Sequence, residues 1–313
     1  MVLLKFGSTG QKVSELQAHL GGLTVDGFYG RMTEAAVRNY QRKNGYEVTG
    51  KVSHSLWGDI FGSEPSTDRF ESKTVIAEKP NPIYADRYYL PSHEYVDEET
   101  AKKEYIFLHH TAGWNNPYNT IQNWERDRRG RIATQFVVGG TLHNVSAEKS
   151  RAKKYDGVIV ECFPDDKWAY HLGNVNSYMH KHSIGIELCS FGRLTESGGR
   201  FYNWIDKEIH GSQVFTLDKP HKGQLYFHKY SKRQIDVLGD LIRYLGDLHQ
   251  IDYTKGLPKL IEQYQSDVNK AFDYSVDAKL GKVRGILSHS NVRTDKDDVY
   301  PDPYLIEMIS RLV

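Results

Sequence analysis

One stretch of this sequence limits the possible folds more than any other, because a short apolar run in it ends in two histidines. The stretch reads Tyr105-Ile106-Phe107-Leu108-His109-His110-Thr111-Ala112-Gly113. Its apolar part has the length of a buried strand, and strand side chains alternate between the two faces of a sheet. At most one of the histidines can therefore bind a metal there, with further ligands from elsewhere in the chain. A hydrogen-bonded structural histidine is the alternative.

A strand that ends in a histidine returns near the C-terminus, where Gly285-Ile286-Leu287-Ser288 precedes His289. The acidic run Asp295-Lys296-Asp297-Asp298 follows soon after it. Two strand-terminal histidines and one loop carboxylate would form a three-ligand site with a fourth position open, as in catalytic zinc sites. A solvated acidic loop is the commoner fate of such a run, and it remains the alternative.

A third candidate strand, Ser183-Ile184-Gly185-Ile186-Glu187-Leu188, carries a carboxylate. Its even positions are apolar, and its odd positions place Ser183, Gly185 and Glu187 on the other face. Because serine and glycine have little bulk, this face is expected to leave space above the strand beside Glu187. The alternative is a glutamate at a strand end that reaches solvent.

Residues 1–62 are predicted to form a small three-helix module. Helical spacing begins at Ser14, Thr33 is expected to cap a second helix, and Ser53 is expected to begin a third. Residues 63–82 are rich in Ser, Glu, Pro, Thr and Lys, and this composition predicts a linker.

The module resembles the type 1 peptidoglycan-binding domain. The segments that carry this resemblance include Gly7–Gly10, Val25–Gly30, Thr33–Val37, Val48–Gly50 and Leu56–Trp57. The resemblance implies contacts with the cell wall, for which the candidate residues are Asp26, Gly27 and Tyr29. A generic three-helix module for protein contacts is the alternative.

Residues 83–313 are predicted to form one larger domain. Strand candidates alternate with helical patterns, which predicts an α/β fold with a mixed β-sheet flanked by helices. Further predicted strands are Thr134–Val138 and Val158–Phe163, and predicted helices are Asn119–Asp127 and 231–249. In the last helix, Ser231 and Gln234 are expected to form a capping box before an apolar stripe that ends in Leu248.

This domain resembles the zinc-dependent N-acetylmuramoyl-L-alanine amidases of the type 2 family, which includes phage lysins and peptidoglycan recognition proteins. The segments that carry the resemblance are Ile106–Gly113, Asp156–Ile159, Trp168–Gly173, Ser183–Leu188, Ser288–Ser290 and Lys296–Asp298. The resemblance implies a peptidoglycan hydrolase. Such an enzyme would use a zinc-activated water to cleave the amide bond between N-acetylmuramic acid and L-alanine.

The resemblance also implies a role for each matching residue. The implied zinc ligands are His109, His289 and Asp298. Glu187 would act as the general base, and Lys296 would stabilise the developing oxyanion. The substrate-binding candidates are His171 and Thr111, although a packed structural role is the alternative for His171. The third ligand stays open, because the usual Lys-Thr-Asp-Pro-Gly pattern is not intact and Asp302 is a rival aspartate.

These motifs leave two alternative functions open, and they do not predict the structure of one long segment. A wall-recognition protein without catalysis and a zinc peptidase that cuts within the stem peptide are the alternative functions. Residues 189–230 are rich in aromatic residues and histidine. They are expected to form either an insertion that flanks the substrate or a hairpin that covers the sheet.

Charge and hydropathy restrict the partners and the location. A net charge of +1 with 26% charged residues gives no sign of binding to nucleic acid or membrane surfaces, so peptidoglycan is the expected partner. No apolar stretch has the length of a membrane span, and Met1–Lys5 lacks a secretory signal. The order of domains resembles phage endolysins, which implies a monomer in the host cytoplasm that reaches the periplasm and cell wall after membrane permeabilisation.

Overall fold

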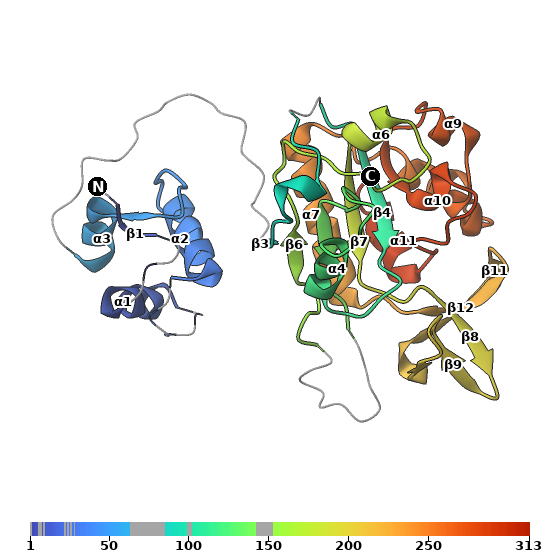
Figure 1. The fold of residues 1–313 in the computed structure, drawn as a ribbon, viewed down its shortest axis with the longest axis horizontal. Helices are drawn as coiled ribbons and strands as arrows, with labels where there is room; N and C mark the ends of the chain where they lie inside the picture. The colour runs from blue at the N-terminus through green and yellow to red at the C-terminus, as the bar shows by residue number, and fades with distance from the viewer. Residues whose placement is uncertain are drawn as a thin grey trace. The chain divides into compact units, whose positions relative to one another are not determined.

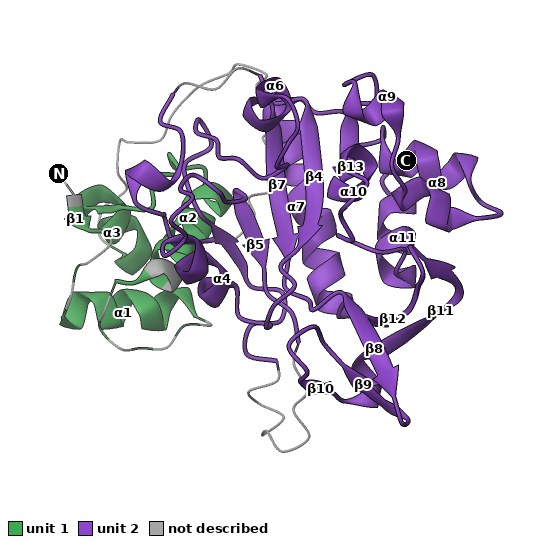
Figure 2. Ribbon diagram, turned by 45° about the vertical axis from the view of Figure 1, so that its right-hand side comes forward, with its two compact units in different colours: residues 1–78 green, residues 79–313 purple. Residues whose placement is uncertain are grey.

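The computed structural model describes residues 2–5, 8, 10–21, 23, 25, 27, 29–62, 85–98, 102–141 and 153–313. The chain divides into two compact units, residues 1–78 and residues 79–313 (Figure 2). The boundary falls inside the segment 63–82, which was predicted as a linker and lies outside the described residues. No helix in the described part of the chain is both long enough and apolar enough to cross a membrane.

The N-terminal unit contains the three predicted helices. They are α1 (Gln11–Leu20), α2 (Arg31–Lys43) and α3 (His54–Phe61), and the antiparallel strands β1 (Val2–Leu4) and β2 (Val52–Ser53) accompany them. A small core that includes Val13, Leu16 and Val37 joins these elements. Ser53 begins α3 as predicted, because its side chain accepts a hydrogen bond of 3.0 Å from the backbone N–H of Leu56.

The prediction that Thr33 caps the second helix was wrong. Helix α2 begins three residues earlier than predicted, at Arg31, with Gly30 as its N-cap. The Thr33 side chain is buried, and its hydroxyl accepts a hydrogen bond of 2.9 Å from Gln17 Nε2 on α1. The hydroxyl therefore joins two helices instead of ending one.

The C-terminal unit is built on a six-stranded sheet in the order β13-β4-β7-β5-β6-β3 (Figure 1). The strands are β3 (Ala85–Arg87), β4 (Tyr105–His110), β5 (Phe136–Val138), β6 (Ile159–Glu161), β7 (Ser183–Leu188) and β13 (Gly285–Ser288). The β5–β6 pair is antiparallel and the other four pairs are parallel. The predicted mixed sheet is confirmed: β7 and β13 have their predicted bounds, whereas β5 and β6 are shorter than predicted.

Helices cover both faces of this sheet. The apolar side chains of one face pack against α7 (Lys232–His249), α8 (Leu257–Gln263) and α11 (Pro303–Ser310). Those of the other face pack against α4 (Pro117–Trp124), α6 (Ser177–Lys181), α9 (Val276–Lys279) and α10 (His289–Val292). Short 3-10 helices are η1 (Ser92–Glu94), η2 (Gly211–Gln213) and η3 (Val268–Phe272). The predicted α/β fold with helices on both sides of a mixed sheet is therefore confirmed.

Helix α7 shows only half of the predicted capping box. The Ser231 hydroxyl accepts a hydrogen bond of 2.9 Å from the backbone N–H of Gln234. The Gln234 amide donates to the carbonyl oxygens of Val138 and Cys189, at 3.1 and 3.2 Å, and so reaches two strand ends of the sheet. Leu248, the last residue of the predicted stripe, is 43% exposed, so the buried stripe ends at Leu245.

Residues 193–228 form a second sheet, which we call the arm. Its strands are β8 (Arg193–Ser197), β9 (Arg200–Tyr202), β10 (Glu208–Ile209), β11 (Val214–His221) and β12 (Gln224–His228), in the antiparallel order β10-β9-β8-β12-β11. The arm projects from the six-stranded sheet in both ribbon views (Figures 1 and 2). Leu217 and Phe227, at the base of the arm, pack in the main core. Because the five strands of the arm pair only with one another, the arm is a separate sheet and not a hairpin laid over the main sheet.

Candidate active site

Neighbouring strands bring three of the predicted site residues to one level of the sheet. In the parallel ladder between β4 and β7, His109 pairs with Glu187. In the ladder between β13 and β4, Ser288 pairs with Leu108, so His289 follows directly after the last pair. Paired residues of parallel strands point to the same face, and His109 and Glu187 therefore stand side by side.

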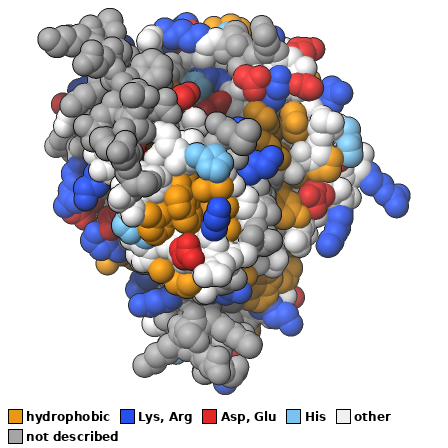
Figure 3. Space-filling model, turned by 90° about the vertical axis from the view of Figure 1, so that its left-hand side faces the viewer, with side chains coloured by type: hydrophobic (Ala, Val, Ile, Leu, Met, Phe, Trp, Pro, Cys, Tyr) orange, Lys and Arg blue, Asp and Glu red, His pale blue; other side chains and the backbone are white. Residues whose placement is uncertain are grey.

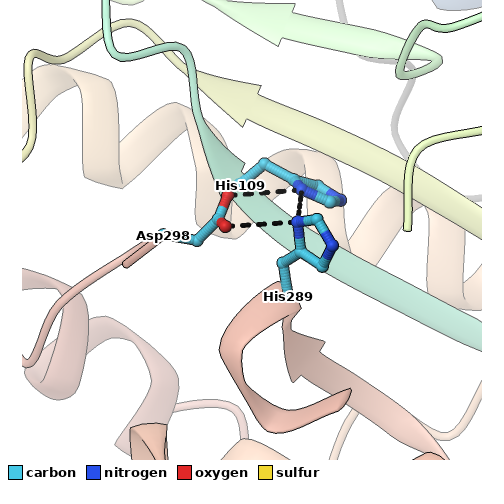
Figure 4. Close-up of side chains that lie close together, drawn as sticks. All are labelled: His109, His289 and Asp298. Atoms are coloured by element: carbon cyan, nitrogen blue, oxygen red, sulfur yellow. Dashed lines mark hydrogen bonds and ion pairs between the residues drawn. The ribbon is translucent and has the colours of Figure 1, made fainter. Parts of the chain in front are cut away.

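The side chains of His109, His289 and Asp298, which we call the metal group, converge at this level (Figure 4). His109 Nδ1 lies 3.1 Å from His289 Nδ1 and 3.4 Å from Asp298 Oδ1. His289 Nδ1 lies 3.1 Å from Asp298 Oδ2. All three residues are buried. His110 is outside the group, and only its backbone N–H reaches Asp298, at 3.3 Å.

Burial and hydrogen bonding set the charges of the metal group. Burial lowers the pKa of His109 to about 4, against the opposing effect of the hydrogen bond to Asp298. Burial would raise the pKa of the Asp298 carboxyl, but hydrogen bonds to the two histidines outweigh it and hold that pKa well below its usual range. At neutral pH, His109 is therefore neutral and Asp298 is ionised, which is the protonation state in which these side chains bind a metal.

The donor set fits a zinc ion. Two imidazole nitrogens and one carboxylate oxygen are typical zinc ligands, and ligands about 2.0–2.1 Å from a tetrahedral ion lie about 3.3 Å from one another. The separations of 3.1–3.4 Å within the metal group match that spacing. Three protein donors also leave one coordination position for water or substrate.

His171 contacts the ring nitrogen of His109 that faces away from the other two residues of the metal group. Its Nδ1 lies 3.0 Å from His109 Nε2, and its Nε2 lies 2.8 Å from the Ser183 hydroxyl. A Cβ atom at Gly185 would come within 2.9 Å of His171 Nδ1. The small residues of β7 therefore leave the expected space above the strand, and His171 fills the part of it above Ser183 and Gly185.

Glu187 and Lys296 both line a cavity of about 410 Å³ that opens at the metal group. Glu187 Oε2 is buried without a hydrogen-bond partner among the described residues. Burial raises the pKa of Glu187 well above its usual value; the charge of Asp298 raises it further, and that of Lys296 lowers it. A carboxyl with a raised pKa accepts a proton more readily than an ordinary carboxyl does, which suits a general base.

The two predicted substrate-binding residues differ in position. His171 lines the cavity, whereas Thr111 is not among the residues that line it. The Thr111 hydroxyl accepts hydrogen bonds from the backbone N–H groups of Gly113 and Ser190, at 3.2 and 3.3 Å. Thr111 therefore holds the turn after β4, and its role in substrate binding stays a prediction.

Asp302, the rival third ligand, begins a helix instead. Its Oδ1 accepts hydrogen bonds from the backbone N–H groups of Tyr304 and Leu305, at 2.9 and 3.3 Å. Its Oδ2 accepts one of 2.9 Å from the Tyr300 hydroxyl. With both oxygens occupied, Asp302 is an N-cap of α11, and the geometry favours Asp298 as the ligand.

The candidate wall-binding residues of the N-terminal unit are Asp26, Gly27 and Tyr29, of which the structure describes the last two. Asp26 lies outside the described residues. Gly27 is half-buried, whereas Tyr29 is fully buried and its hydroxyl donates to the carbonyl oxygen of Gly50 at 3.2 Å. Tyr29 is thus a core residue, which corrects the prediction that it contacts the wall.

An aromatic group marks the surface of the same unit. Phe61 is 42% exposed, and its ring lies 4.4 Å from that of Trp57 and 5.1 Å from that of His19. Figure 3 shows a face of the molecule on which hydrophobic side chains gather beside a histidine. Apolar groups of this kind often mark contact surfaces.

Comparison with known families identifies the larger unit. A family model described as N-acetylmuramoyl-L-alanine amidase matches residues 99–301, more than half of the sequence. The chain belongs to this amidase family. A second model, described as a putative peptidoglycan binding domain, matches residues 9–58 at the N-terminus of the amidase.

No curated protein matches this amidase in sequence. The amidase AmiD from E. coli is similar in structure at 16% identity and a TM-score of 0.30, over 50% of this chain and 48% of that one. PlyL is similar at 12% identity and a TM-score of 0.36, over 73% and 96% of the two chains. A mutant endolysin from Bacillus subtilis is similar at 14% identity and a TM-score of 0.33, over 60% and 97%. The chain thus spans about half the length of the AmiD chain, and its family membership rests on the sequence match alone.

Sequence reasoning missed most of the walls of the amidase cavity. Aromatic and basic residues of these walls are Trp124, Arg129, Tyr170, Phe191, Arg193 and Trp204. The only signal for the last three was the aromatic enrichment of residues 189–230. Which of the rings reaches the cavity depends on how the arm folds, and the local sequence pattern does not contain that information.

Proposed function

We propose that this amidase hydrolyses the bond between N-acetylmuramic acid and L-alanine in bacterial peptidoglycan, with Zn²⁺ as its cofactor. The observation that carries the proposal is the buried metal group with Glu187 beside it, inside the segment that the amidase family matches. When bound by His109, His289 and Asp298, zinc supplies a water of lowered pKa and polarises the scissile carbonyl.

The other residues of the site then have distinct tasks. Glu187 accepts the proton of the attacking water at Oε2 and passes it to the leaving amine, which its raised pKa favours. The Lys296 ammonium stabilises the negative charge that develops on the carbonyl oxygen. His171 fixes the ring of His109 through their 3.0 Å contact, as an outer partner commonly does for a ligand histidine.

The N-terminal module has a separate task in this proposal. It binds peptidoglycan and raises the local concentration of substrate at the catalytic domain without altering the chemistry. We further propose that the protein acts as a monomeric phage endolysin. It would accumulate in the host cytoplasm and reach the periplasm and cell wall once the inner membrane is permeabilised.

Mass analysis of digested peptidoglycan tests the reaction directly. We expect the purified protein to release intact stem peptides and to leave glycan strands that carry free lactyl groups. A chelator should abolish this release, and added zinc should restore it. Activity that persists in a metal-free preparation would contradict the role of zinc.

The same digest separates the alternative functions. A zinc peptidase would leave part of each stem peptide attached to the glycan. A recognition protein without catalysis would release nothing while still binding to sacculi. The metal group together with the unpaired Glu187 oxygen favours the hydrolase, because a binding protein needs no such base.

A further inference from the structure

The arm contributes a fixed aromatic ring to the cavity of the active site. Trp204, which follows β9, lines the cavity although 65% of its surface is exposed. Its indole N–H donates a hydrogen bond of 2.6 Å to the carbonyl oxygen of Ala112. Ala112 lies in the turn directly after β4 and adopts a left-handed backbone conformation, with φ of 49°. The ring is therefore held at a set position relative to the strand that carries His109.

The surroundings of Trp204 combine flat apolar and paired polar groups. Phe191, two residues before the arm, and Arg193, the first residue of the arm, also line the cavity. The Arg193 guanidinium forms a salt bridge of 2.8 Å with Asp297, which also lines the cavity. This wall offers an exposed ring beside groups that can donate and accept hydrogen bonds, and its formal charges cancel.

Such a wall matches a pyranose ring better than an acidic peptide. A sugar ring has apolar C–H faces and a rim of hydroxyl and amide groups, so it can stack on a tryptophan and hydrogen-bond at its edge. An acidic peptide would favour a basic group without a carboxylate partner. The two guanidinium groups that line the cavity are already paired, Arg129 with Asp127 and Arg193 with Asp297. Lys296, the third cation of the lining, is the residue assigned above to the developing oxyanion and lies outside this wall.

We propose that Trp204 is a specificity residue that stacks on a sugar ring of the glycan strand next to the muramoyl group under attack. The inference rests on the proposed amidase function and adds the substrate class to it: glycan-linked peptidoglycan rather than single muramoyl peptides. A rigid tryptophan supplies this contact at a low cost in side-chain entropy. The arm thus serves substrate selection, whereas the metal group and Glu187 serve the chemistry.

Steady-state kinetics on two soluble substrates tests the proposal in the full-length protein. One substrate is a tetrasaccharide that carries stem peptides, and the other is a single N-acetylmuramoyl peptide. We expect Trp204→Ala to raise KM for the tetrasaccharide about ten-fold, to leave KM for the monosaccharide within two-fold, and to change kcat little for either. Trp204→Phe should retain most of the tetrasaccharide affinity, although it loses the hydrogen bond to Ala112.

Two comparisons decide the outcome. Tyr178→Ala removes another exposed aromatic ring, outside the cavity, and should leave both KM values unchanged. An equal rise of KM for both substrates in Trp204→Ala, or a fall of kcat alone, would overturn the glycan assignment.

A binding measurement keeps this test separate from the proposed reaction. Calorimetric titration with a peptide-free tetramer of N-acetylglucosamine needs no hydrolysis, and every variant retains the N-terminal module. The parent protein should bind the tetramer more tightly than Trp204→Ala does, whereas equal affinities would overturn the proposal. If the parent binds the tetramer in this way but hydrolyses neither substrate, the amidase proposal fails and the glycan site stands.

Discussion

At Glu187, the requirements of folding and of chemistry conflict. A buried carboxyl with a raised pKa and an unpaired oxygen lowers the stability of the folded state, yet the same features suit a general base. Residues that reduce stability in this way are often found where activity requires them. Glu187 stands beside His109, so the proposed role as general base would explain why the chain tolerates this loss of stability.

Substitution of Glu187 by Gln separates the two effects. We expect the variant to keep its metal and its fold, to melt at the same temperature or higher, and to lose at least about 100-fold in kcat, because an amide cannot accept the proton. In the parent, activity should fall as pH falls through the raised pKa of Glu187, because protonation removes the base. This fall of activity at low pH should be absent from the residual activity of the variant. If the variant hydrolyses peptidoglycan at the parental rate, Glu187 has a structural role only.

The third metal ligand can be assigned by a pair of alanine variants. Asp298→Ala should lose bound zinc, because it removes the oxygen donor that faces both histidines. Asp302→Ala should keep the zinc and lose about 1 kcal/mol of stability, because it removes only the cap of α11. Zinc content by elemental analysis and the free energy of unfolding measure the two effects. The opposite pattern would transfer the ligand role to Asp302.

Single residues were predictable where one local rule decides their position. Alternation along a strand showed that at most one of His109 and His110 could be a ligand, and the family resemblance then implied His109. Alternation also placed Glu187 on a face with small neighbours. The same pattern could not show what occupies the space above those neighbours. His171 fills it from a separate loop, and its contacts with His109 and Ser183 depend on tertiary structure. The prediction that Tyr29 contacts the wall was wrong for a similar reason, because a turn motif does not show whether the tyrosine ring faces solvent or the core.

At the scale of elements, Gln234 connects helix α7 to the sheet next to the active site. Its side-chain amide is the donor to the carbonyl oxygens of Val138, at the end of β5, and Cys189, directly after β7. Val138 also accepts a hydrogen bond from the backbone N–H of Cys189. The Cys189 carbonyl therefore depends more on Gln234 than the Val138 carbonyl does.

Replacement of Gln234 by Leu should lower the free energy of unfolding by about 1–3 kcal/mol, because it leaves a buried carbonyl without its donor. Chemical denaturation of the parent and the variant measures the loss. Gln263→Leu, at the exposed end of α8, is the control and should change stability by less than about 0.5 kcal/mol. Equal effects of the two substitutions would show that the buried amide adds nothing specific.

Elements with strong periodic patterns were predictable, and weakly patterned ones were not. The apolar alternation of Ser183–Leu188 and the compact run Gly285–Ser288 gave both strands their observed bounds. The arm was missed as a sheet because most of its strands are short and largely exposed; in Arg193–Ser197 only Leu194 is buried. Its pairing depends on contacts between strands far apart in sequence, which local propensity does not report.

At the scale of the whole molecule, the two compact units predict a divisible protein. We expect a chain without residues 1–62 to fold, to hydrolyse soluble muropeptides at the parental rate and to bind intact sacculi poorly, because the module that it lacks supplies local concentration and not chemistry. Sedimentation with purified sacculi and a soluble-substrate assay measure the two properties. Undiminished binding to sacculi by the shortened chain would assign another role to the module.

The distribution of the metal group along the chain also affects its synthesis. His109 and His289 are 180 residues apart, and the second lies just after β13, the last strand in the described part of the chain. A nascent chain that ends between residues 188 and 288 carries His109 and Glu187 but neither His289 nor Asp298. Synthesis that stops in this interval therefore yields products without the complete metal group, and under the proposed function these products would be unable to hold zinc through it.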